Sequence, residues 1–144
     1  TSNGQFTVDT QVDSLSVQLD TQSDSGNIGD NITNETRPHF SGKAEAGSRI
    51  VLTIDGQLLN TTADSHGEWS VVAQNILADG VYDYEVKATD VAGNSAVVTA
   101  SVQIKTTLHP TTLQLNNQSD FITSQLTPTL SGLSEANAKI SIAI

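Results

Sequence analysis

A chain of 144 residues is long enough for one domain of typical size, and this one carries a formal net charge of −10. Such a charge repels nucleic acid and anionic lipid, so neither is an expected partner. The chain has no cysteine, which excludes a disulfide framework and thiol chemistry. No apolar run approaches the roughly 18 residues that span a bilayer, so membrane insertion is not expected.

Alternating apolar and polar residues predict strands along most of the chain. In residues 81–89, for example, Tyr84, Val86 and Ala88 alternate with polar side chains, as in a half-buried antiparallel strand. The same reasoning predicts about seven strands, at 14–20, 38–43, 49–55, 58–64, 68–73, 81–89 and 95–105.

Turn signals separate these strands. Asp55-Gly56 and Asp79-Gly80 supply the positive φ angles that tight hairpins need. Short strands, regular turns and a single tryptophan, Trp69, predict an all-β, immunoglobulin-like β-sandwich. Trp69 falls at an inward position, so we expect a core residue there. The alternative is a platform on which a sugar ring stacks.

The chain also repeats itself. Residues 114–120 resemble residues 18–24, and residues 128–136 resemble residues 38–46, whereas the stretch 25–30 has no counterpart. This periodicity predicts a tandem-repeat fragment. The expected parts are the tail of a preceding repeat with its linker (1–9), one complete repeat (10–105) and the first strands of a following, truncated repeat (106–144).

Four motifs stand out in the central repeat: SG-x-AE-x-G at 41–47, G-x-W at 67–69, LADG-x-Y at 77–82 and ATD-x-AGN at 88–94. Together they resemble the bacterial Ig-like repeats of very large surface adhesins, such as biofilm-associated proteins and RTX-type adhesins. The resemblance implies a non-enzymatic stalk repeat, secreted or held at the bacterial cell surface, that supports cell adhesion and biofilm formation. It implies neighbouring repeats of the same polypeptide as partners, and calcium at the joints between them.

In a seven-strand sandwich the chain runs back and forth between two ends. The end where the N-terminal linker arrives, here called the proximal end, is expected to gather Asp9, Glu45 and Asp90. Asn94 lies close by in sequence. Because calcium takes about six to eight oxygen ligands, these residues predict a calcium site shared with the preceding repeat.

The opposite, distal end is expected to hold a second acidic group. Asp20, Asp24 and Asp30 lie along one loop whose glycines let main-chain carbonyls turn inward. These three residues are the second predicted calcium site. The alternative is an ordinary solvated loop, because Asp, Asn and Gly are the usual residues of turns and the spacing is not that of an EF-hand. The turn interpretation is favoured for Asp55, Asp64 and Asp79.

The joint after the central repeat differs in sequence. Lys105 stands where the preceding linker has Asp9, so we expect this joint to be poor in calcium. The segment 106–144 corresponds to only three strands, with apolar residues that its own strands cannot cover. Isolated strands of this kind seek a partner, which predicts strand exchange with another chain or packing against the central domain.

A rival function is an Ig-like glycan- or protein-binding module, which an exposed aromatic cluster would favour. Catalysis is not expected. The chain has no G-x-S-x-G nucleophile elbow, and its histidines lack the spacing of a zinc site. Asp83 and Glu85 form a carboxylate pair on an outward strand face, where solvation is more common than glycoside hydrolysis.

Overall fold

The computed structural model describes residues 4, 7–107, 112–115 and 130–142. The chain divides into two compact units, Thr1–Thr106 and Thr107–Ile144, each with its own strands. The predictions that concern residues 1–3, 5–6, 108–111, 116–129 and 143–144 lie outside the described residues. Among these are the repeated residues Asn116 to Asp120 and Pro128.

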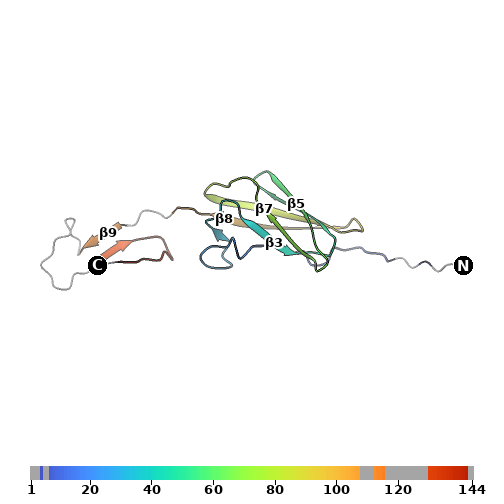
Figure 1. The fold of residues 1–144 in the computed structure, drawn as a ribbon, viewed down its shortest axis with the longest axis horizontal. Helices are drawn as coiled ribbons and strands as arrows, with labels where there is room; N and C mark the ends of the chain where they lie inside the picture. Colours follow the sequence, from blue (N-terminus) through green and yellow to red (C-terminus); the bar gives the residue numbers. More distant parts are fainter. Residues whose placement is uncertain (1–3, 5–6, 108–111, 116–129, 143–144) are drawn as a thin grey trace. The chain divides into compact units, whose positions relative to one another are not determined.

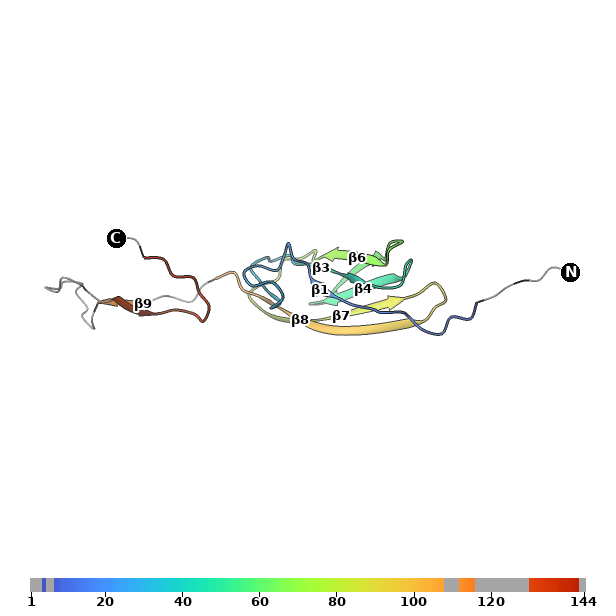
Figure 2. The same cartoon turned by 90° about the horizontal axis from the view of Figure 1, so that it is seen from below.

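The first unit is a sandwich of two sheets (Figures 1 and 2). One sheet has the order β1-β3-β6 and the other β2-β8-β7-β4-β5, and every pair except β2–β8 is antiparallel. This arrangement confirms the predicted all-β, immunoglobulin-like sandwich. The strands are β1 (Gln18–Leu19), β2 (Ile32–Thr33), β3 (His39–Lys43), β4 (Arg49–Ile54), β5 (Gln57–Thr62), β6 (Glu68–Val72), β7 (Gly80–Thr89) and β8 (Ser95–Ile104).

The core lies between the two sheets and follows the predicted alternation. On β7, Tyr84, Val86 and Ala88 are buried while the residues between them are exposed. Their facing partners include Phe40, whose ring centroid lies 4.7 Å from that of Tyr84. A strand with every second side chain buried is fixed in register, because a shift by one residue would turn its apolar side chains to solvent.

Trp69 is a core residue, with only 4% of its surface exposed. Its indole passes over Gly42, where an added Cβ would come 2.7 Å from Cζ2 of Trp69 and would collide with the carbonyl oxygen of Ser16. Glycine is therefore the residue that lets the tryptophan and the chain before β1 approach β3. Because the indole is covered, the alternative of a sugar-stacking platform at Trp69 is wrong.

Two strands depart from the sequence prediction. β2, within the loop 20–34, is not predicted, because two residues in a polar loop carry no periodicity to detect. It pairs with β8 in parallel, placing Ile32 opposite Gln103. β1 is shorter than the predicted strand at 14–20, although Leu15 and Val17 still pack against the core.

The second unit contains an antiparallel pair, β9 (Thr112–Leu115) and β10 (Leu130–Leu133). Gln114 faces Ser131 and Leu115 faces Leu130. These positions correspond in the repeat to Gln18 facing Ser41 and Leu19 facing Phe40, which is the register of β1 and β3. The second unit thus reproduces the first strand pairing of the sandwich.

The turn after this pair is also reproduced. The N–H of Ala138 donates to the carbonyl of Glu135, as the N–H of Ser48 donates to that of Glu45. Asn137 has a φ of 64°, and Gly47 at the corresponding position has a φ of 81°. Asparagine is among the few residues that tolerate this left-handed backbone. These agreements support the tandem-repeat interpretation, whose domain boundaries stay a prediction.

The two ends of the first sandwich can be followed in Figures 1 and 2. The N-terminal segment arrives at the proximal end, which holds the turns 44–48, 63–67 and 90–94. Strand β8 leaves at the distal end, which holds the loop 20–34 and the segment 73–79. The described residues include no helix that could cross a membrane.

Candidate metal centre

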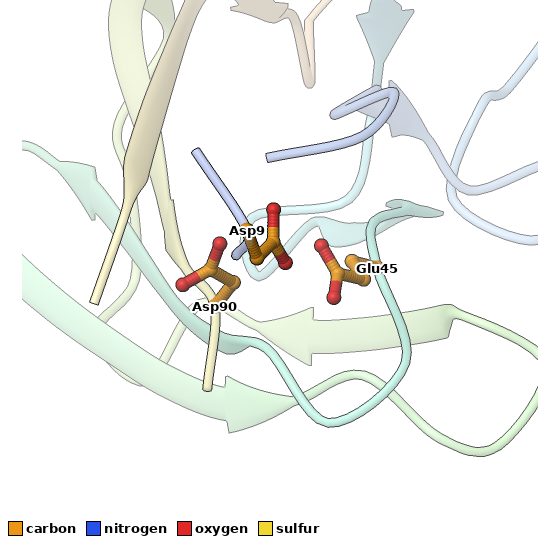
Figure 3. Close-up of side chains that lie close together, drawn as sticks. All are labelled: Asp9, Glu45 and Asp90. Atoms are coloured by element: carbon orange, nitrogen blue, oxygen red, sulfur yellow. The ribbon is translucent and has the colours of Figure 1, made fainter. Parts of the chain in front are cut away.

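Three carboxylates meet at the proximal end of the sandwich. Asp9 of the linker, Glu45 of the β3–β4 turn and Asp90 of the β7–β8 turn each contribute an oxygen, and these oxygens lie within 4.8 Å of one another. Figure 3 shows Asp9 lying between the other two. No other group of three potential metal-ligating side chains comes this close in the part of the chain that the structure describes.

Asp90 is held rigidly, with 6% of its surface exposed. Its Oδ1 accepts the main-chain N–H of Asn94 at 2.8 Å, and its Oδ2 accepts the Asn94 side-chain amide at 2.7 Å. Burial acts to raise the pKa of Asp90, but the hydrogen bonds from Asn94 and from the backbone N–H groups of Gly93 and Ala92 outweigh it. The pKa is therefore lowered, and the carboxylate is ionised at neutral pH.

Glu45 and Asp9 are placed by their backbones. The carbonyl of Glu45 accepts the N–H of Ser48 at 3.0 Å, which closes the turn, and Gly47 donates to the carbonyl of Ala63. Asp9 accepts the N–H of Gln11 on its Oδ1 at 3.3 Å. The Glu45 side chain is half-buried and that of Asp9 is exposed, so the group opens to solvent on its linker side.

Asn94 connects the linker to the sandwich. Its side-chain nitrogen donates to the main-chain oxygen of Asp9 at 3.1 Å and to Oδ2 of Asp90. Both neighbours are acceptors, so the amide must present its nitrogen to them. Asn94 was predicted as a ligand. The structure places its nitrogen against the two aspartates, and a ligand role for its oxygen stays a prediction.

The charge at this site is uncompensated by the described side chains. An ion pair joins Lys43 and Glu68, at 3.7 Å, and involves none of the three carboxylates. Three like charges at this separation repel one another. A divalent cation would convert that repulsion into attraction, and carboxylate oxygens are the ligands that calcium prefers. The donor set therefore fits calcium, with carbonyls or water completing the shell.

The predicted distal group is not brought together in the same way. Asp20 accepts the N–H of Gln22 on its Oδ1 at 3.0 Å, and Asp30 accepts the N–H of Ile32 on its Oδ1 at 2.9 Å. Bonds of this kind, from a carboxylate to the backbone two residues on, are those of ordinary Asx turns. For these two residues the contacts are those that the alternative of a turn-rich loop predicts.

Asp24 differs from its two neighbours because it is buried, with 5% of its surface exposed. Its Oδ2 accepts the N–H of Gly29, whereas its Oδ1 has no hydrogen-bond partner among the described residues. A buried carboxylate oxygen without a partner is unfavourable and unusual in folded proteins. A bound cation at this oxygen would remove the penalty.

The aspartates assigned to turns divide into two kinds. Asp64 accepts the N–H groups of His66 and Glu68, and these bonds lower its pKa. Asp55 has a φ of 46° in the β4–β5 turn. Asp79 instead accepts hydrogen bonds from Thr106 at the end of the sandwich, a contact that its Asp-Gly sequence does not reveal.

On β7, the side chains of Asp83 and Glu85 are exposed, as predicted.

Comparison with known proteins identifies a family for the first sandwich. The family model for the bacterial Ig-like domain matches residues 11–106. The chain is similar to a bacterial immunoglobulin-like domain from the M. primoryensis ice-binding adhesin, with 28% identity and a TM-score of 0.39 over 62% of this chain and 92% of that chain. It is also similar to a Ca2+-stabilized adhesin that helps an Antarctic bacterium reach out and bind ice, with 26% identity and a TM-score of 0.45 over 74% of this chain.

This chain spans 27% of the length of that second protein. None of the curated proteins matches the chain. The family match covers more than half of the 144 residues and includes every strand of the first sandwich. The chain therefore belongs to the family of bacterial Ig-like domains.

Proposed function

We propose that this chain is a non-enzymatic extender repeat of a bacterial surface adhesin, and that calcium at its proximal end stiffens the joint with the preceding repeat. The observation that carries the proposal is the meeting of Asp9, from the linker, with Glu45 and Asp90, from two turns of the sandwich. The protein would be secreted or held at the cell surface, where a stalk of such repeats supports adhesion and biofilm formation. Neighbouring repeats of the same polypeptide are its partners.

The joint works through the linker carboxylate. Without a cation, repulsion from Glu45 and Asp90 opposes the approach of Asp9, while the hydrogen bond from Asn94 to the main-chain oxygen of Asp9 favours it. With calcium, the three carboxylates share one ion and the linker is fixed to the sandwich. Cation binding thus changes the stiffness of the stalk, and the negative charge of the remaining surface keeps linked copies soluble.

We infer a second cation position at Asp24. The support is its buried, unpartnered Oδ1, within the loop where calcium was expected from the sequence. Carbonyls of the surrounding glycine-bearing loop are the natural further ligands. Asp20 and Asp30 bond to local N–H groups and would have to turn to contribute.

The test is a calorimetric calcium titration of this chain, with a melting curve at each calcium concentration. Wild type is expected to bind calcium and to melt at a higher temperature with it. Asp9→Asn/Asp90→Asn is expected to lose the proximal binding event, and Asp24→Asn the distal one. The matched control is Asp83→Asn/Glu85→Gln, which removes two exposed carboxylates of β7.

Two results would contradict the proposal. One is the absence of heat and of any change in melting temperature with wild type. The other is an equal loss of binding in the control, which would mean that calcium only screens the net charge. Either result would favour the rival function, a glycan- or protein-binding module, although the burial of Trp69 leaves that module without its expected stacking surface.

A further inference from the structure

We propose that Asp79 and strand β2 form a clamp that holds the start of the C-terminal linker, Lys105 and Thr106, against the first sandwich without a metal ion in the clamp. This distal clamp does not use the proximal carboxylates Asp9, Glu45 and Asp90. It assigns a role to two features that the sequence does not reveal, the parallel strand β2 and the carboxylate of Asp79.

On one side of the linker, Asp79 receives two hydrogen bonds from a single residue. Its Oδ1 accepts the main-chain N–H of Thr106 at 3.1 Å and the Thr106 hydroxyl, Oγ1–H, at 2.6 Å. A charged acceptor makes both bonds stronger than their neutral equivalents. Asp79 precedes β7, so its position is set by the sandwich and not by the linker.

On the other side, the last residues of β8 are paired with β2. The N–H of Gln103 donates to the carbonyl of Asn31 at 2.9 Å, and the N–H of Lys105 donates to the carbonyl of Thr33 at 2.8 Å. The second of these bonds lies beyond the end of β8 at Ile104. The backbone hydrogen bonds between β2 and β8 therefore continue into the linker at Lys105 and restrict its motion.

The loop that carries β2 is itself anchored. Thr33 is fully buried, and its hydroxyl donates to the carbonyl of Ser23. Ser23 is also buried, and its Oγ accepts the N–H of His39 at the start of β3. The loop 20–34 thus connects the linker to the first sheet as well as the second, which supplies a structural purpose for a polar loop of this length.

The two ends of the sandwich are consequently held by different means. At the proximal end, three carboxylates crowd the linker and Asn94 supplies a side-chain donor to its backbone. At the distal end, backbone N–H groups and one hydroxyl donate to carbonyl oxygens and one carboxylate, and each of these hydrogen bonds is attractive without an added ion. These contacts of Lys105 and Thr106 should therefore form without calcium at the proximal end.

The experiment measures amide exchange rates of Gln103, Lys105 and Thr106 by NMR, in EDTA and in calcium. In wild type we expect all three amides to be protected already in EDTA. Asp79→Ala should raise the exchange rate of Thr106 about tenfold, the size expected for loss of one such hydrogen bond, and leave core amides of β4 and β7 unchanged. Asp83→Ala, which removes an exposed carboxylate of β7, is the matched control and should change nothing.

A second variant keeps the test decisive if Asp79→Ala fails to fold. Thr106→Val has nearly the same volume and keeps the N–H, but lacks the hydroxyl donor, so it should raise the exchange rate of the Thr106 amide severalfold. Exchange that is equally fast in wild type and both variants would overturn the clamp. So would protection that appears only with calcium. Failure of calcium binding itself would leave the expected EDTA result unchanged, so the two proposals can fail separately.

Discussion

The side-chain amide of Asn94 donates to the main-chain oxygen of Asp9 at 3.1 Å, and so joins the N-terminal linker to the β7–β8 turn. The same nitrogen donates to Oδ2 of Asp90. One amide therefore brings together the backbone of one candidate ligand and the carboxylate of another. The contact holds the linker through the main-chain oxygen of Asp9 and does not use the Asp9 carboxylate.

Asn94→Asp tests this role. The variant replaces an N–H donor by an acceptor and adds a fourth negative charge beside Asp9 and Asp90. In EDTA we expect a lower melting temperature than that of wild type, and calcium should restore more of the loss than it does in Asn94→Ala. Asn75→Asp adds the same charge at an exposed position and serves as the control. Equal melting temperatures for Asn94→Asp and Asn75→Asp in EDTA would argue against the role.

Asp64 gives the stability a predictable pH dependence. Hydrogen bonds from the N–H groups of Glu68 and His66 lower its pKa from the ordinary value of 3.8. Because the pKa is lower in the folded state, the contribution of the Asp64 carboxylate to the free energy of unfolding is fully present above the ordinary pKa of 3.8. It is lost as the pH falls through the folded pKa. The destabilisation caused by Asp64→Ala should therefore be large at pH 7 and shrink toward pH 2.

Urea unfolding of wild type and Asp64→Ala across that pH range checks this expectation. Asp55→Ala, at an aspartate of another turn, is the comparison variant, because it removes a carboxylate without touching the hydrogen bonds to Asp64. If the free energies of unfolding of wild type and Asp64→Ala differ by a constant amount down to pH 2, the charge of the Asp64 carboxylate does not stabilise the turn.

Gly42→Ala should destabilise the sandwich strongly. The added Cβ would collide with the carbonyl oxygen of Ser16 and lie 2.7 Å from Cζ2 of Trp69. Overpacking of this kind costs about 1–3 kcal/mol or more, because the backbone must shift. Gly80→Ala is the matched control, since its Cβ would meet Tyr82 at an ordinary 3.7 Å. Urea unfolding should give a clearly smaller loss for Gly80→Ala, and the reverse order would contradict the packing described for Trp69.

The second unit is expected to associate with other chains. Ile140 and Ile142 are 56% and 57% exposed, which supports strand exchange as the partner interaction predicted from the sequence. Sedimentation should show association that increases with protein concentration and weakens in Ile140→Ser/Ile142→Ser. Val97→Ser, at an exposed apolar residue of β8, should leave it unchanged. A monomer at every concentration tested would rule out strand exchange.

Sequence patterns were sufficient where a structure follows from local periodicity or from the direction of the chain. The alternation in β7 fixes which side chains are buried, and the succession of strands alone places Asp9, Glu45 and Asp90 at one end. The meeting of these three carboxylates is thus a consequence of topology. Whether calcium binds there is a separate question, because binding also depends on further ligands that the strand order does not specify.

The features that escaped prediction depend on contacts between distant residues. β2 has two residues and no pattern, and its partner is the far end of β8. Asp79 has the sequence context of a hairpin turn, but its carboxylate bonds to Thr106. The burial of Asp24 similarly depends on how the whole loop folds over it. In each case the local sequence is compatible with several outcomes, and tertiary packing selects one.

The strand pairs β1–β3 and β9–β10 share one register, which bears on the folding of proteins that contain many such domains. The pairing is kept although Phe40 is replaced by Leu130, and the following turn is kept although Gly47 is replaced by Asn137. One backbone plan therefore tolerates divergent side chains. Domains of repeat proteins generally fold as units, and exchange of strands between domains is a characteristic failure of their folding. Each repeat therefore carries in its own sequence the signals for this first pairing and turn, so a domain can begin to fold before the next one has been synthesised.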